Sequence, residues 1–289
     1  MSPPPEGTSG PPSAGRFRPL PDRDGRTAGD EAGFLGLPAR APKPRPVGLT
    51  HVLDRGVPLA NFEPLVASIA RFADIWKFGW GTSYLDRDLG DKLAILARHQ
   101  VLACPGGTLA EIAWLRGRIG DFLAWAEAMG FAAVEISNGA TAMTATEKRR
   151  LIALAAGRFV VLSEVGSKDP RVTCSPADLA RQARADLEAG ARWIVLEGRE
   201  HGNVGLYRED GSVREEVVEA VISASGPGPV VFEAPRKEQQ VWLIRRLGRD
   251  VNLGNVAPAD VLGLETLRLG LRADTLFLLS ADPERPADA

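Results

Sequence analysis

Short apolar segments alternate with longer amphipathic segments along most of this chain, and this alternation is the strongest constraint on its fold. Each apolar segment is short enough to be a buried strand, and most are followed by a stretch with helical periodicity. This order is typical of parallel strands joined by crossover helices. We expect strands over residues 48–54, 74–78, 101–104, 132–137, 159–165, 192–197, 230–233 and 251–253.

Eight strand–helix units in about 230 residues match the size and order of a (β/α)8 TIM barrel. A doubly wound open sheet is the competing fold, but it usually carries a Gly-x-Gly-x-x-Gly turn after its first strand. The first expected strand here has no such turn after it. We therefore predict an α/β protein with a (β/α)8 barrel.

The two ends of the chain differ in composition from the rest. Residues 1–46 hold eleven of the 22 prolines, interspersed with Gly, Arg and Asp, and have too little apolar surface to offset the entropy of ordering. We expect a disordered, Pro-rich N-terminal leader over residues 1–46, a barrel domain over 47–280 and a frayed tail over 281–289.

Composition also limits the partners and the compartment. The 289 residues carry a net charge of -2, which gives no reason to expect nucleic acid or an anionic membrane as a partner. Two cysteines are too few for a disulfide framework and fit a reducing compartment. No apolar run approaches the ~18 residues of a membrane span, and the Met-Ser-Pro-Pro-Pro start lacks the apolar core of a signal peptide. We expect a cytoplasmic protein, and a homo-oligomer.

One lysine, Lys77, interrupts the second expected strand between Trp76 and Phe78. A lysine among apolar residues is costly to bury without a partner. The partner is either a carboxylate on a neighbouring strand or an anionic substrate. Gly79 and Gly81 follow the strand and allow backbone amides to approach a bound anion. Several later strands end in the same way, which favours the second alternative.

Polar residues also end most of the other expected strands. In a barrel these carboxyl ends meet on one face. Side-chain alternation predicts that Glu135 shares a face with Ser137, and Glu197 with Arg199. Carboxylates crowded together need cations or a metal, and an oxygen-rich site suits Mg²⁺. The pattern predicts a small, multiply anionic substrate held with a divalent cation.

Some polar residues have simpler explanations. Thr108 and Glu111 match the Thr-x-x-Glu pattern of a helix capping box, and we interpret them mainly as one. Asp54 fits an ion pair at the rim as well as it fits a role in the site. Cys104 and His51 lie within expected strands, where a packed side chain is the simpler interpretation.

Nine motifs together resemble the phosphosulfolactate synthase family, and the similarity runs from about Gly48 to Thr275. The motifs are Leu53-Asp-Arg-Gly56, Lys77-Phe-Gly-Trp-Gly-Thr-Ser83, Pro105-Gly-Gly-Thr-Leu109, Val134-Glu-Ile-Ser137, Glu164-Val-Gly166, Glu197-Gly-Arg-Glu200, Phe232-Glu-Ala-Pro235, Val251-Asn-Leu253 and Leu264-Glu-Thr-Leu-Arg268.

The resemblance implies a barrel lyase that adds sulfite to phosphoenolpyruvate with Mg²⁺, giving (2R)-phospho-3-sulfolactate for coenzyme M synthesis or sulfolactate formation. It implies that Lys168, after the Glu-Val-Gly motif, is the general acid. We expect the metal near Glu135, Glu164 and Glu197. We expect the substrate to bind at Lys77, Arg199, Gly107, Ser137, Gly254 and Asn255.

Three positions depart from the family pattern. Members usually have Lys where Arg55 stands, Asp where Asn138 stands and a second Lys where Ser167 stands. Losing one anion at Asn138 and one cation at Ser167 nearly conserves charge, so we expect the site to be retained. The departures bear instead on substrate preference.

Two alternatives remain open at this stage. One is a related barrel lyase that adds a different nucleophile to phosphoenolpyruvate. The other is a non-catalytic relative, similar to the plant heat-stress-associated proteins. The presence of Lys77, Lys168, Glu197 and Arg199 favours catalysis, because a decayed site would be expected to lose some of these residues.

Overall fold

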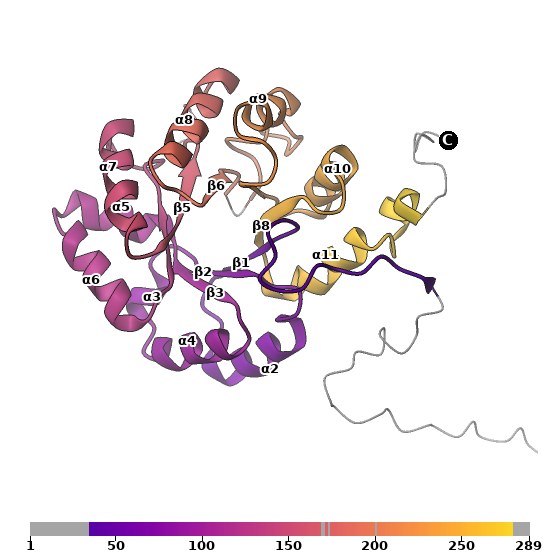
Figure 1. Cartoon of the computed structure of the whole chain (residues 1–289), viewed down its shortest axis with the longest axis horizontal. Coiled ribbons are helices and arrows are strands. Elements are labelled where there is room, and N and C mark those ends of the chain that lie inside the picture. The colour runs from indigo at the N-terminus through magenta and orange to yellow at the C-terminus, as the bar shows by residue number, and fades with distance from the viewer. Residues whose placement is uncertain (1–34, 169–170, 173, 200, 280–289) are drawn as a thin grey trace, which may run out of the picture. The chain divides into compact units, whose positions relative to one another are not determined.

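Eight parallel strands form the centre of the protein. A computed structural model describes residues 35–168, 171–172, 174–199 and 201–279 (Figure 1). The hydrogen-bonded order is β3-β2-β1-β8-β7-β6-β5-β4, and β3 also contacts β4, so the sheet nearly closes on itself. The predicted (β/α)8 barrel is confirmed. Its strands are β1 (Thr50–Asp54), β2 (Ile75–Phe78), β3 (Leu102–Pro105), β4 (Ala133–Ile136), β5 (Val160–Val165), β6 (Trp193–Leu196), β7 (Val230–Glu233) and β8 (Asn252–Val256).

Helices surround the strands, as Figure 1 shows. Apolar side chains on their inner faces and on the outer faces of the strands make one continuous core. Among the described residues, no helix has both the length and the apolar character needed to cross a membrane. The helices are α2 (Leu59–Ile69), α3 (Thr82–Leu85), α4 (Leu89–Arg98), α5 (Gly107–Leu115), α6 (Ile119–Met129), α7 (Ala145–Ala156), α8 (Pro176–Glu188), α9 (Glu215–Ser225), α10 (Lys237–Leu247) and α11 (Val261–Arg268), with 3-10 turns at Pro258–Asp260 and Ala273–Leu279.

The barrel interior has a second, smaller apolar cluster, which positions the site above it. Strand side chains alternate between two faces, so a residue two positions further along points to the same side. In five of the strands, a charged residue stands two positions after a member of this cluster. These five charged residues form the next layer towards the carboxyl ends of the strands. The pairs are Ile75 and Lys77, Ala133 and Glu135, Leu162 and Glu164, Val195 and Glu197, and Val231 and Glu233.

Residues 39–46 belong to the compact barrel unit, which begins at Ala39, whereas the sequence predicted a start at Val47. Lys43 Nζ donates to the carbonyls of Ala70, Ala73 and His99 at 2.9, 2.8 and 3.1 Å. These carbonyls follow the ends of α2 and α4, where helices leave acceptors unpaired. Basic side chains in a proline-rich segment therefore find partners that composition does not reveal. The first 34 residues of the predicted leader and the predicted tail over 281–289 lie outside the described residues.

A buried ion pair holds the same segment to the barrel. Arg45 Nε lies 3.2 Å from Asp74 Oδ1, and both side chains are almost fully buried. Asp74 Oδ2 also accepts a hydrogen bond from the Thr50 amide at 2.9 Å. Burial raises the pKa of Asp74 despite the opposing charge of Arg45.

We expect Arg45→Ala to lower the free energy of unfolding by about 3–5 kcal/mol, because it leaves the Asp74 carboxylate buried without its main cation. Arg98→Ala is the matched control, since Arg98 pairs with Glu63 at the exposed surface and its loss matters little. Urea unfolding of both variants is the measurement. Equal losses would show that the buried pair has no special role.

Candidate active site

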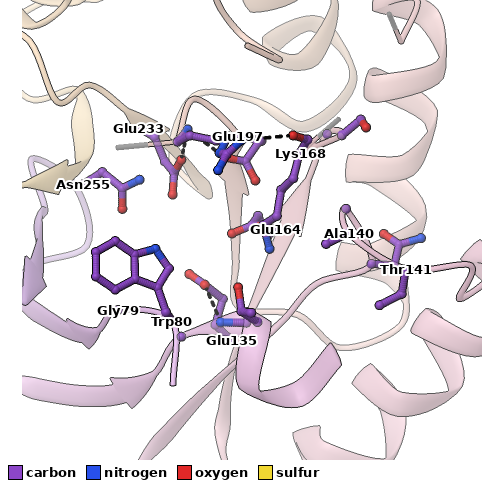
Figure 2. Close-up of a pocket in the computed structure, with 18 of the residues that line it drawn as sticks. Gly79, Trp80, Glu135, Ala140, Thr141, Glu164, Lys168, Glu197, Glu233 and Asn255 are labelled. Carbon is purple, nitrogen blue, oxygen red and sulfur yellow. Dashed lines mark hydrogen bonds and ion pairs between the residues drawn. The ribbon is translucent and has the colours of Figure 1, made fainter. Parts of the chain in front are cut away.

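A cavity of about 790 Å³ opens at the carboxyl ends of the strands. Its lining includes the charged layer described above, the loops that follow β2 to β6, and Asn255 near the end of β8 (Figure 2). The predicted residues that line it are Lys77, Gly107, Glu135, Glu164, Lys168, Glu197, Arg199 and Asn255. A barrel gathers its functional groups at this face because all strands run the same way.

Lys77 lies between two carboxylates from distant strands. Its Nζ is 3.0 Å from Glu233 Oε1 and 3.3 Å from Glu135 Oε2. Burial opposes the charge on Lys77, but Glu135 and Glu233 outweigh it and raise the pKa of Lys77 well above its ordinary value. Lys77 is therefore a fixed cation in the cavity wall. The carboxylate partners considered in the sequence analysis exist, on β4 and β7.

Glu135 is held from a second side by the start of α5. The Gly107 amide donates to Glu135 Oε1 at 2.8 Å. A Cβ on Gly107 would lie 2.8 Å from the Ser137 Cβ, so only glycine brings this amide close enough. Burial raises the pKa of Glu135 to about 7, against the effect of Lys77. Gly107 lines the cavity, but its amide is already used by Glu135.

Lys168 reaches into the cavity from the loop after β5, and Figure 2 shows its side chain running towards Glu164. Its Nζ lies 2.7 Å from Glu164 Oε1, 2.9 Å from Ser137 Oγ and 3.1 Å from Glu111 Oε2. Burial disfavours the ammonium, yet the surrounding carboxylates, Glu164 foremost, raise the pKa of Lys168. Lys168 is a protonated group with an acceptor available for each of its three hydrogens.

Glu164, Glu197 and Glu233 form the acidic cluster of the site. One oxygen from each lies within 4.8 Å of the other two. Glu197 Oε2 is buried and accepts no hydrogen bond from the described residues. Burial, followed by Glu164 and Glu233, raises the pKa of Glu197 well above its ordinary value. An unpartnered oxygen in an all-carboxylate donor set suits a hard divalent cation.

Backbone strain shapes the turn after β6 and the carboxyl end of β8. Arg199 has φ 56° and Asn255 has φ 53°, which lie in a left-handed backbone region that residues other than glycine rarely adopt. In this conformation the Arg199 amide donates to both Glu197 Oε1, at 2.7 Å, and Glu233 Oε2, at 2.9 Å. The Gly198 amide donates to the same Glu233 oxygen at 2.9 Å. The turn therefore stabilises two members of the acidic cluster.

Comparison with known proteins gives the family. The model for (2R)-phospho-3-sulfolactate synthase matches residues 38–274. The chain belongs to that family. It is 42% identical over 245 residues to the phosphosulfolactate synthase of Methanothermobacter thermautotrophicus, covering 83% of this chain and 95% of that protein. It is 40% identical over 247 residues to the Bacillus subtilis phosphosulfolactate synthase, covering 84% and 98%. The resemblance identified from the motifs is confirmed.

Solved structures support the barrel alone. The chain aligns with a 3-hexulose-6-phosphate synthase at a TM-score of 0.50 and 14% identity, covering 76% of this chain and 98% of that one. It aligns with the YdjI aldolase of Escherichia coli K12 at a TM-score of 0.51 and 14% identity, covering 82% and 92%. At such identities the comparison bears on the fold and not on the activity.

Two of the residues predicted to bind substrate in this phosphosulfolactate synthase relative lie below the cavity surface. Ser137 is fully buried beneath Lys168, and its hydroxyl lies 2.6 Å from Glu164 Oε1. A Cβ on Gly254 would lie 2.9 Å from His51 Nδ1, so packing inside the barrel accounts for this glycine. His51 is itself fully buried, as predicted. Substrate contacts of Ser137 and Gly254 stay predictions.

The predicted metal set differs from the acidic cluster by one residue. Glu164 and Glu197 come together as expected, but the third member is Glu233, while Glu135 pairs with Lys77. Glu233 ends β7 and was recognisable as a polar residue at a strand end. Its distance from the other carboxylates depends on how the strands are staggered, which the sequence does not reveal.

The capping-box prediction for Thr108 and Glu111 was wrong. Helix α5 begins at Gly107, with Gly106 at the N-cap and no side-chain cap. Glu111 therefore lies beyond the first turn and points to Lys168 and Ser137. Asp54 is fully buried and accepts hydrogen bonds from Gly56, Val57 and the Trp76 indole, so it shapes the turn after β1. Glu200 lies outside the described residues.

Proposed function

We propose that this protein adds sulfite to phosphoenolpyruvate at the cavity described above, giving (2R)-phospho-3-sulfolactate. Membership of the phosphosulfolactate synthase family is the observation that carries the reaction. The site chemistry agrees with it, because the two substrates are anions and the cavity combines fixed cations with an acidic cluster. Bringing two anions together requires neutralisation first.

The reaction needs one new bond and one proton. The sulfur lone pair of sulfite bonds to C3 of phosphoenolpyruvate, and the π electrons of the C2–C3 bond move towards C2 and the carboxylate. An acid then protonates C2. We propose that Lys168 donates this proton, since it is protonated and lines the cavity, and that solvent restores it.

Cations along the wall are proposed to hold the substrate. Lys77 and Arg199 face phosphate or carboxylate oxygens, where charge develops as sulfite adds. Asn255 lies near the carboxyl end of β8, a region that commonly binds phosphate in barrels, and it lines the cavity. These assignments use residues that already line the cavity.

Mg²⁺ is the proposed cofactor, and Glu164, Glu197 and Glu233 would hold it. A bound Mg²⁺ would supply positive charge for the substrate oxygens. The carboxylates themselves keep Lys77 and Lys168 protonated and oriented, which is a separate role.

The departures from the family pattern bear on which nucleophile is used. Asn138 and Ser167 line the cavity, whereas Arg55 is an exposed residue outside the lining. Asn138 Nδ2 donates to the Met143 carbonyl at 2.9 Å and so holds its own loop. A related lyase with another nucleophile is the alternative that these positions leave open. The predicted cytoplasmic location and homo-oligomeric assembly stay predictions.

We expect purified protein supplied with Mg²⁺ to convert phosphoenolpyruvate and sulfite to phosphosulfolactate, and ³¹P NMR is the measurement. Removal of the metal with EDTA is expected to stop the conversion, and Mg²⁺ to restore it. A parallel reaction without sulfite controls for hydrolysis of the phosphate ester. A folded protein that forms no phosphosulfolactate would contradict the proposed function.

Lys168→Ala is expected to lower kcat roughly 10²- to 10⁴-fold, the usual contribution of a general acid. Steady-state kinetics with both substrates is the measurement, and circular dichroism shows whether the variant folds. Wild-type turnover in Lys168→Ala would exclude this lysine as the acid.

The metal set is tested by binding rather than by activity. We expect Glu233→Gln to weaken Mg²⁺ binding by at least the ~10- to 100-fold typical of outer-shell changes. Glu135→Gln is the matched comparison. Glu135 and Glu233 both pair with Lys77, but of these two only Glu233 belongs to the acidic cluster. Isothermal titration with Mg²⁺ gives both values. A larger loss in Glu135→Gln would favour the set predicted from the sequence.

A further inference from the structure

Glu111 is a buried carboxylate on the inner side of α5, only 1% exposed. Its two oxygens have different partners. Oε2 lies 3.1 Å from Lys168 Nζ. Oε1 accepts a hydrogen bond from the Ala140 amide at 2.8 Å and lies 3.2 Å from Ser137 Oγ. One side chain from a surrounding helix therefore joins the lysine after β5 to the loop after β4.

Helix formation does not explain a carboxylate at this position. Since α5 starts at Gly107 without a side-chain cap, Glu111 satisfies no free amide at the helix end. A buried carboxylate is costly unless its partners compensate, and truncating one partner of such a pair is strongly destabilising. The partners of Glu111 lie at the cavity, which points to a role there.

The loop that Glu111 contacts is part of the cavity wall. Asn138, Gly139, Ala140 and Thr141 all line the cavity, and Figure 2 shows Ala140 and Thr141 on the side towards Lys168. The Lys168 amide also donates to the Gly139 carbonyl at 3.1 Å. The Lys168 backbone is thus hydrogen-bonded directly to this loop, and the Lys168 side chain is linked to the loop through Glu111.

Lysine side chains are flexible, and each acceptor around Nζ removes part of that freedom. Glu164 and Ser137 hold Nζ from the strand ends, at 2.7 and 2.9 Å. Glu111 is the third acceptor and the one on a surrounding helix. Without it, Nζ keeps two acceptors and can turn away from the loop that lines the cavity.

We propose that Glu111 is a positioning residue, which holds the Lys168 ammonium and the 138–141 loop in one arrangement for proton transfer to C2 of the substrate. This inference rests on the proposed function, in which Lys168 is the proton donor. It goes beyond that function by assigning part of the catalytic geometry to a residue that does not line the cavity.

Glu111→Gln is the informative substitution, because the amide keeps an acceptor for Ala140 and removes the charge facing Lys168. We expect kcat to fall ~10- to 100-fold, as for small misplacements of a reacting group, with little change in the KM for phosphoenolpyruvate. The solvent deuterium isotope effect on kcat should rise, since proton transfer becomes slower. A purely structural defect reduces the active fraction and leaves that isotope effect unchanged.

Glu147→Gln is the matched control. Glu147 forms a true capping box with Thr144 at the start of α7, on the surface. We expect it to change the melting temperature and to leave kcat and the isotope effect at wild-type values. If Glu111→Gln does not fold, Glu111→Asp is used instead. It keeps the charge but draws it back by one methylene, and the same changes in kcat and isotope effect are expected.

A double-mutant cycle with Lys168→Ala tests whether Glu111 acts through Lys168. We expect the Glu111 substitution to have almost no further effect on kcat once Lys168 is absent. The same fold loss in both backgrounds, or an unchanged isotope effect, would overturn the proposal while leaving the proposed function intact. A wild-type protein that forms no phosphosulfolactate would instead overturn both.

Discussion

Repulsion among buried carboxylates is the constraint on which the site depends. Strands β4 to β7 each place a glutamate in the same inner layer, within or directly after the strand. Four such charges are unfavourable together unless cations and amides offset them. Lys77 bridges two of them, Lys168 holds a third, and the turn after β6 donates amides to two. The geometry of each residue therefore depends on its neighbours across the barrel.

A closed barrel is what brings these groups together. Lys77 and Glu233 are 156 residues apart in the chain, yet they meet because β2 and β7 face the same interior. The apolar cluster beneath them fills the barrel and excludes water from below. In such surroundings charge interactions are stronger than in water. The same packing that stabilises the fold therefore makes the lysines effective partners for anions.

Local sequence was enough to predict the strands and most of the charged residues that line the cavity, and it failed where geometry between elements decides. Lys77, Glu164 and Glu197 stand out because they are charged residues at the ends of apolar segments. Glu111 does not, because Thr-x-x-Glu fits a capping box until the first residue of the helix is known. The Arg45–Asp74 pair was missed for a related reason. Arg45 lies in a proline-rich segment and Asp74 at the start of a strand, and only the folded barrel brings them together.

The two lysines of the cavity differ in a way that bears on the proton donor. The Lys77 side chain is 6% exposed, and its ion-pair partners among the described residues are both carboxylates, so giving up its proton would leave them facing each other. The Lys168 side chain is 17% exposed, and one of its acceptors is the neutral Ser137 hydroxyl. A donor must regain its proton from water in every cycle, which greater exposure favours. This difference assigns fixed charge to Lys77 and supports Lys168 as the proposed acid.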